Sequence, residues 1–252
     1  MTALLLAACG SSASQQPVHS ALQTPSYSTN PAPSSTPTRN AGVTPEPPKA
    51  ANPLTPLPEP PRTREGHPIV YITFDDGPSQ RYTNEVLDTL ATHHATATFF
   101  VVGKRAMRLP SIVRRALSAG NTVASHSWSH PHLVELPRSA IAEQLRRTRS
   151  TLSTLGASTR CFRPPYGETN RRVRAAAQSL GLREYLWTTE SKDWTKEPAQ
   201  QTARIAASGL QPGAIIVFHD GNASGSTATI HAVDQFLTIA ESKGYVTAAL
   251  PC

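Results

Sequence analysis

The stretch IVYITFDDGP (residues 69–78) decides how the chain folds. Its first six residues are apolar or strand-favouring, which predicts a strand buried within a parallel sheet. Two carboxylates, Asp75 and Asp76, follow at once, and Gly77-Pro78 then predicts a tight turn. Negative charges at the end of a buried strand are costly unless a partner balances them. The stretch therefore predicts a strand that carries acidic groups into a site.

Segments of this kind alternate with helix-like segments, several of which end in glycine, from residue 69 onward. Such alternation predicts a parallel sheet with crossover helices, and the number of strands favours a barrel-like closure over an open sheet. We expect strands at residues 69–74, 95–102, 121–126, 160–164, 183–189, 214–219 and 245–250. We expect helices at residues 84–94, 110–120, 139–156, 170–181, 200–209 and 229–244.

The first 64 residues have a different composition. Residues 10–64 are rich in Pro, Ser and Thr without apolar periodicity, so they bury too little surface to offset their ordering entropy and predict a disordered linker. Residues 1–9 end in Leu-Ala-Ala-Cys, which resembles the lipobox of a bacterial lipoprotein signal. That resemblance implies a lipid on Cys9 and a domain, residues 65–252, anchored outside the cytoplasm at a bacterial cell surface, or secreted if the anchor is not used.

Charge and cysteine content narrow the choice of partners. The chain has 24 Lys and Arg against 17 Asp and Glu, and a basic surface favours anionic lipid, an acidic cell wall or nucleic acid. Nucleic acid is not expected, because the sequence has no dense basic block or RNA-binding signature.

In an exported protein Cys161 and Cys252 can form a disulfide, the alternative being two buried thiols. We expect a monomer.

Polar residues follow five of the predicted strands. In parallel α/β folds functional side chains gather at the carboxyl ends of strands, so these segments are expected to meet in one site. They are the acidic pair of residues 75–76, HSWSHPHL (126–133), RPPYG (163–167), WTTESKDW (187–194) and the pair at 219–220.

The pattern HxxxH predicts a metal site. His126 and His130 are four residues apart, so their rings converge on one helical turn or a tight loop. With one carboxylate they would form a two-histidine, one-carboxylate site with open positions, suited to Zn²⁺ or another divalent metal. One aspartate of the pair would hold the ion while its neighbour accepts a proton from water. As alternatives, the histidines could be an unrelated pair on the surface, and the aspartates could cap the N-terminus of a helix. His132 is expected in the loop at the rim of the site.

Five motifs, TFDDGP, HSWSH, RPPYG, SKDW and IVFHD, resemble in order and spacing those of the polysaccharide deacetylases, the NodB homology domain of carbohydrate esterase family four. The resemblance covers residues 67–252. It implies a distorted (β/α) barrel that removes acetyl groups from sugars, commonly from N-acetylglucosamine polymers such as peptidoglycan or chitin-like chains. Two alternatives stay open: an O-acetyl esterase on acetylated xylan or a similar glycan, and a non-catalytic glycan-binding module.

The resemblance also implies roles around the metal. It makes Asp75 the catalytic base and Arg163 the arginine that pairs with and orients this base. It makes Asp76, His126 and His130 the ligands of a divalent metal, with Zn²⁺ expected and Co²⁺ or Ni²⁺ as alternatives.

A second group of roles concerns the acid and the substrate. The resemblance makes His219 the general acid, Asp193 the carboxylate that tunes it, and the backbone N–H of Tyr166 the oxyanion donor. Pro165, Tyr166 and Trp194 are implied substrate contacts. One departure is Glu190, which stands where the family usually has aspartate and carries one more methylene. Because Asp193 and Trp194 are retained, we expect the chemistry to survive, and the effect of Glu190 on fine geometry and substrate preference stays open.

Overall fold

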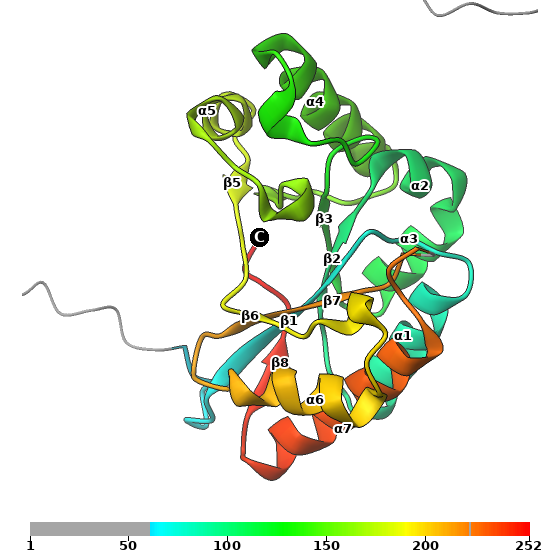
Figure 1. Ribbon diagram of the computed structural model, residues 1–252, viewed down its shortest axis with the longest axis vertical. Helices are drawn as coiled ribbons and strands as arrows, with labels where there is room; N and C mark the ends of the chain where they lie inside the picture. Colours follow the sequence, from blue (N-terminus) through cyan, green and yellow to red (C-terminus); the bar gives the residue numbers. More distant parts are fainter. Residues whose placement is uncertain (1–60, 222) are drawn as a thin grey trace, which may run out of the picture. The chain divides into compact units, whose positions relative to one another are not determined.

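The computed structural model describes residues 61–221 and 223–252. The predicted signal segment (1–9), the predicted lipidation at Cys9 and most of the predicted linker (10–64) lie outside the described residues. Within them, eight strands form one curled sheet whose strand pairs are parallel, and helices pack around its outside (Figure 1). This architecture confirms the predicted distorted (β/α) barrel.

The first strand pairs with three other strands of the sheet. On one edge β1 pairs with β7, and on the other it pairs with β8 through Ile69–Tyr71 and with β2 through Thr73–Asp75. The strand order is β5-β4-β3-β2-β1-β7-β6. The strands are β1 (Ile69–Asp75), β2 (Thr98–Val101), β3 (Thr122–Ser125), β4 (Cys161–Phe162), β5 (Arg183–Glu184), β6 (Thr189–Glu190), β7 (Ile215–His219) and β8 (Val246–Ala248).

The single strand predicted at residues 183–189 is wrong in one respect, because two short strands occupy this region. β5 lies at one end of the strand order and β6 at the other, so residues 185–188 connect the two ends of the curled sheet. The carbonyls of Tyr185 and Leu186 accept hydrogen bonds from the Arg163 side chain at 3.1 and 3.2 Å, instead of from a neighbouring strand. A buried guanidinium thus interrupts the strand that the apolar pattern predicts.

The helices follow the prediction except for α2, which is too short to produce a recognisable apolar period. Two helices begin at a side-chain cap: Asn170 accepts from the first turn of α5, and Ser226 accepts from Thr229 N in α7. No helix within the described residues is long and apolar enough to cross a bilayer. The helices are α1 (Tyr82–Thr92), α2 (Gly103–Arg108), α3 (Pro110–Ser118), α4 (Arg138–Thr154), α5 (Arg171–Ser179), α6 (Ala199–Ser208) and α7 (Thr227–Ser242).

Alternation along β1 decides where the first carboxylate points. Val70, Ile72 and Phe74 belong to the main hydrophobic core, together with residues of α1, α6 and α7. Successive side chains of a strand point to opposite faces, so Thr73 and Asp75 face the interior of the curled sheet. Asp75 therefore ends β1 with its carboxylate directed inward.

The carboxyl terminus fills part of this interior (Figure 1). Leu250 is buried against Phe100, and its backbone N–H donates to Thr98 Oγ1 at 2.8 Å. Cys252, two residues later, is joined to Cys161 of β4 by a disulfide. The bond fixes the chain end to the strand that precedes Arg163.

Candidate active site

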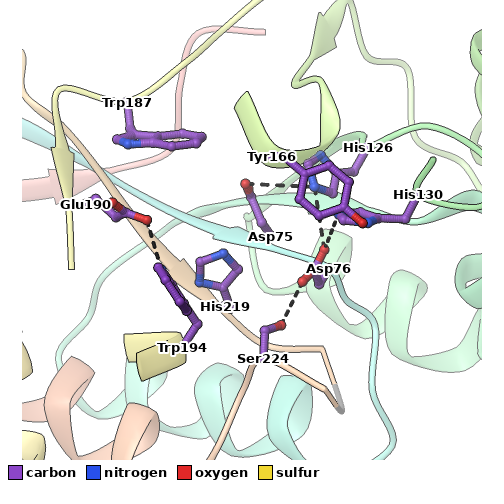
Figure 2. Close-up of a pocket in the computed structure, with 10 residues that line it drawn as sticks. All are labelled: Asp75, Asp76, His126, His130, Tyr166, Trp187, Glu190, Trp194, His219 and Ser224. Atoms are coloured by element: carbon purple, nitrogen blue, oxygen red, sulfur yellow. Dashed lines mark hydrogen bonds and ion pairs between the residues drawn. The ribbon is translucent and has the colours of Figure 1, made fainter. Parts of the chain in front are cut away.

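A cavity of about 390 Å³ opens where β1, β3 and β7 end (Figure 2). Residues far apart in the sequence meet there because every described strand pair is parallel, which puts the carboxyl ends of the strands at one edge. The lining residues are Asp75, Asp76, His126, His130, Tyr166, Trp187, Glu190, Trp194, His219 and Ser224.

The two adjacent aspartates point in different directions because of their backbone. Asp75 is the buried last residue of β1, whereas Asp76 has a left-handed φ of 71° that turns the chain out of the strand. Oδ1 of Asp75 accepts a hydrogen bond from Arg163 Nη1 at 2.7 Å, and the same nitrogen donates to Thr73 Oγ1 at 2.8 Å. Burial lowers the pKa of Arg163, and the negative charge of Asp75 opposes that effect.

The second aspartate forms a cluster with the two histidines. Oδ1 of Asp76 lies 2.9 Å from His130 Nε2 and 3.5 Å from His126 Nε2. Burial disfavours the charged form of Asp76, but the hydrogen bonds and charges of both histidines outweigh it and hold its pKa far below the ordinary value. The Nδ1–H of His126 donates to the carbonyl of Arg163 at 2.9 Å, which leaves its Nε2 facing Asp76.

This donor set fits a divalent metal. One carboxylate oxygen and two imidazole nitrogens lie within 4.8 Å of one another, and together they are the ligand types that Zn²⁺ and similar cations take in open sites. Oδ2 of Asp75 is 3.9 Å from His126 Nε2, so the first aspartate borders the cluster without belonging to it.

The HSWSH segment forms a tight loop rather than a helical turn. Ser127 and His130 have left-handed φ angles of 63° and 62°, and Ser127 Oγ accepts from His130 N at 3.0 Å. The side chain of Gln144 in α4 accepts from Trp128 N at 2.9 Å and from Ser129 N at 3.0 Å. These contacts hold a backbone that few non-glycine residues adopt, as is common at functional sites.

His219 and Asp193 form a second pair in the site, separate from the cluster of Asp76 and the two histidines. Nδ1 of His219 lies 2.8 Å from Asp193 Oδ1, and Asp193 Oδ2 accepts from His219 N at 2.8 Å. Ser191 Oγ donates to Asp193 Oδ1, and Thr229 Oγ1 donates to Oδ2. Each carboxylate oxygen of Asp193 therefore has two hydrogen-bond partners. Burial disfavours the imidazolium, but the hydrogen bond and charge of Asp193 outweigh it and raise the pKa of His219 to about 9.

Aromatic side chains form the rim of the cavity. Tyr166 and Trp194 are 53% and 52% exposed, which is unusual for large rings and suits contact with a sugar. His132 stacks on Tyr166 with 4.0 Å between ring centroids, and its Nδ1 pairs with Glu168 at 2.9 Å. Pro165 is buried and is not among the lining residues, so the structure does not place this predicted contact against a substrate.

Ser224 was not identified as a site residue from the sequence. Its hydroxyl donates to Asp76 Oδ2 at 2.7 Å, which holds the oxygen that does not face the histidines. Ser224 lies in the Gly- and Ser-rich stretch after β7, where no periodic pattern indicates a function. The only sequence signal is its position just after a strand that ends in the site.

Asp220 and Trp187 were also given no role. Asp220 is fully buried, accepts from Thr83 Oγ1 at 2.5 Å, and has its pKa raised by burial to about 7. A Cβ on Gly77 would collide with its carboxylate, so the turn after the aspartates requires glycine. Trp187 lines the cavity from the segment that connects β5 and β6.

Comparisons with known proteins show which family the chain resembles. A family model described as polysaccharide deacetylase matches residues 62–185. A chitooligosaccharide deacetylase of Sinorhizobium fredii is 33% identical, over 76% of this chain and 94% of its own. The peptidoglycan-N-acetylglucosamine deacetylase PgdA of Listeria monocytogenes is 35% identical over 75% of this chain, which spans 39% of that longer protein.

A solved structure is similar as well. The family 4 carbohydrate esterase from Streptomyces lividans, in complex with acetate, superposes with a TM-score of 0.67 at 32% identity. The match covers 71% of this chain and 91% of that one. The chain therefore belongs to the polysaccharide deacetylase family and is an enzyme of the carbohydrate esterase 4 type.

Proposed function

We propose that the protein is a metal-dependent hydrolase that removes N-acetyl groups from an N-acetylglucosamine polymer, with peptidoglycan as the first candidate and chitin-like oligomers as the second. One observation carries the proposal. Arg163 binds Oδ1 of Asp75, while Oδ2 lies 3.9 Å from His126 at the border of the Asp76–His126–His130 cluster. A fixed carboxylate beside an open metal site is what the deprotonation of a water molecule requires.

The base side of the site works through Asp75. The guanidinium of Arg163 donates to Oδ1 at 2.7 Å, and this contact fixes the direction of the carboxylate. Oδ2 accepts a proton from the attacking water, a step that general base catalysis accelerates by about 10²–10⁴-fold.

Asp76, His126 and His130 would hold the cation, for which Zn²⁺ is the first choice. A divalent metal bound there polarises the amide carbonyl and makes a water molecule more acidic. Ser224 and the carbonyl of Arg163 orient two of these three ligands from outside the cluster.

The acid side works through His219. Asp193 holds the Nδ1 atom, so Nε2 is the atom that gives a proton to the leaving nitrogen. The C–N bond breaks, the acetyl carbon keeps the oxygen of water, and acetate and an amine leave. The backbone N–H of Tyr166, in a residue with φ of 61°, is the donor we assign to the developing oxyanion.

We also propose that this catalytic domain works outside the cytoplasm and is anchored through a lipid on Cys9. The disulfide between Cys161 and Cys252 supports an oxidising compartment. The lipobox-like residues 1–9 and the linker composition of residues 10–64 support the anchor.

Acetate release tests the function. The purified protein, treated with chelator and then given Zn²⁺, Co²⁺ or Ni²⁺, is incubated with N-acetylglucosamine oligomers, peptidoglycan and acetylxylan. We expect metal-dependent release from the N-acetyl substrates. Release from acetylxylan alone would establish the O-acetyl esterase, and binding without release from any substrate would establish a non-catalytic module.

A further inference from the structure

The pocket contains one carboxylate whose charge is not balanced by a cationic side chain. Asp75 pairs with Arg163, Asp76 with two histidines, and Asp193 with His219. Glu190 instead accepts a hydrogen bond at 2.9 Å from the neutral indole N–H of Trp194. Among the described residues it forms no salt bridge, although it lines the cavity.

Glu190 lies on the side of the pocket where the leaving group is protonated. Its strand, β6, pairs with β7, with Glu190 opposite Val217, two residues before His219. Figure 2 shows Glu190 and Trp194 beside His219, across the pocket from His126 and His130. A sugar chain bound with its reacting nitrogen at His219 would therefore pass near this carboxylate.

The geometry leaves an oxygen of Glu190 available to a ligand. Trp194 binds Oε1, and no other side chain of the described residues donates to the carboxylate. An ionised carboxylate has about four acceptor positions, so most of them face the cavity or solvent. The contact with Trp194 also restrains the side chain, which reduces the entropy that binding would otherwise cost.

We propose that, on chitin-like chains, Glu190 binds the ammonium group of a glucosamine unit next to the N-acetylglucosamine being hydrolysed, so that the enzyme prefers partly deacetylated chitin oligomers over fully acetylated ones. This inference rests on the proposed function, because amide hydrolysis turns a neutral acetamido group into an amine that is protonated near neutral pH. A charge-assisted hydrogen bond to an ammonium is stronger than one to a sugar hydroxyl. Each deacetylation then creates a recognition group for the next.

The test compares two tetramers of equal length, one fully acetylated and one carrying a single glucosamine beside an N-acetylglucosamine. We expect wild type to favour the second tetramer by about fivefold in kcat/KM per acetyl group, because partly exposed charge pairs contribute modestly to binding. The difference should appear mainly in KM, because the proposed contact binds the substrate and takes no part in the bond-breaking step. Glu190→Gln keeps an acceptor for Trp194 but loses the charge, so its ratio should fall to about one. Glu197→Gln, an exposed change of equal charge in the same segment, should keep the wild-type ratio.

Two results would overturn the proposal: no wild-type preference, or a Glu190→Gln variant that keeps it. A calorimetric arm separates this failure from failure of the proposed function. Wild type should bind a glucosamine tetramer about tenfold more tightly than Glu190→Gln does. If wild type releases no acetate from any oligomer, the proposed deacetylase function fails, and calorimetry still decides whether Glu190 binds an ammonium group. If wild type releases acetate but both proteins bind the glucosamine tetramer equally, only the role of Glu190 fails.

Discussion

Arg163 and Asp75 are joined by a 2.7 Å hydrogen bond between two buried, oppositely charged side chains. The same guanidinium binds the carbonyls of Tyr185 and Leu186, in the segment that connects the two ends of the curled sheet. Arg163 therefore links the position of the base to the closure of the barrel. Because one oxygen of Asp75 is committed to this pair, the other is the one that can accept a proton.

Removing one histidine of the cluster should weaken metal binding. His130→Ala takes away the nitrogen 2.9 Å from Asp76 Oδ1. Changes outside the ligand shell already cost about 10–100-fold in affinity, so we expect a loss above about 100-fold by chelator competition. His132→Ala is the matched control, because His132 stacks on Tyr166 outside the cluster. Equal affinity of His130→Ala and wild type would remove His130 from the site.

The hydroxyl of Ser224 should affect the metal through Asp76. Ser224→Ala deletes the 2.7 Å hydrogen bond to Oδ2 and lets the carboxylate rotate. We expect metal affinity to fall by about tenfold. The free energy of unfolding measured by urea denaturation of the metal-free protein should stay unchanged. Ser208→Ala, whose hydroxyl bonds only to Ile205 in α6, should change neither quantity. An unchanged metal affinity in Ser224→Ala would show that this bond does not orient the ligand.

The alkaline limit of activity should follow the pKa of His219. The acid must be protonated, and Asp193 raises its pKa to about 9, so activity falls as pH rises through that region. In Asp193→Asn the carboxylate charge is gone, the pKa of His219 drops, and the alkaline limb of kcat/KM against pH should move to lower pH. Asp234→Asn, a change on the outer helix α7, should leave the limb in place. An unmoved limb in Asp193→Asn would exclude His219 as the acid tuned by Asp193.

His93, the residue that follows α1, should make the free energy of unfolding depend on pH. Burial opposes its protonation, but hydrogen bonds to Asp234 and Glu241 of α7 outweigh this and raise its pKa. A raised pKa means that the stabilisation is fully present below about 6.5 and is lost as pH rises through the higher folded-state value. Between pH 6 and pH 9, the free energy of unfolding of wild type should therefore fall by about 1 kcal/mol more than that of His93→Gln. The difference is this small because both carboxylate partners are well exposed to solvent. Parallel unfolding curves for the two proteins across this range would contradict the prediction.

Much of the fold could be predicted because the apolar pattern of the strands is strong. The run before Asp75 and the run before His219 have the composition of buried strands, and the two strands that they form pair with each other. The break in residues 183–189 could not be predicted, since it depends on Arg163, some 20 residues earlier, taking the carbonyls of Tyr185 and Leu186. The short helix α2 has too few residues to show a period.

The candidate site also contains residues that the sequence could predict and residues that it could not. Residues that sit directly at strand ends, such as Asp76 and His126, were recognised from motif and position. Ser224 was missed, and Asp220 was found by its position after β7 but given no role. Each acts through a neighbour, Ser224 on the Asp76 carboxylate and Asp220 beneath Gly77. Contacts of this kind are set by tertiary packing. No local spacing or composition indicates them.

The central claim is that Asp76 binds a cation while its neighbour Asp75 removes a proton, and one variant tests it most directly. Asp75→Asn keeps the shape of the side chain but removes the basic oxygen, so metal content and acetate release are measured on the same preparation. We predict one bound divalent ion per chain with wild-type affinity, and acetate release from N-acetylglucosamine oligomers reduced by about 10²-fold or more. Near wild-type acetate release by this variant, or loss of its metal, would contradict the division of roles.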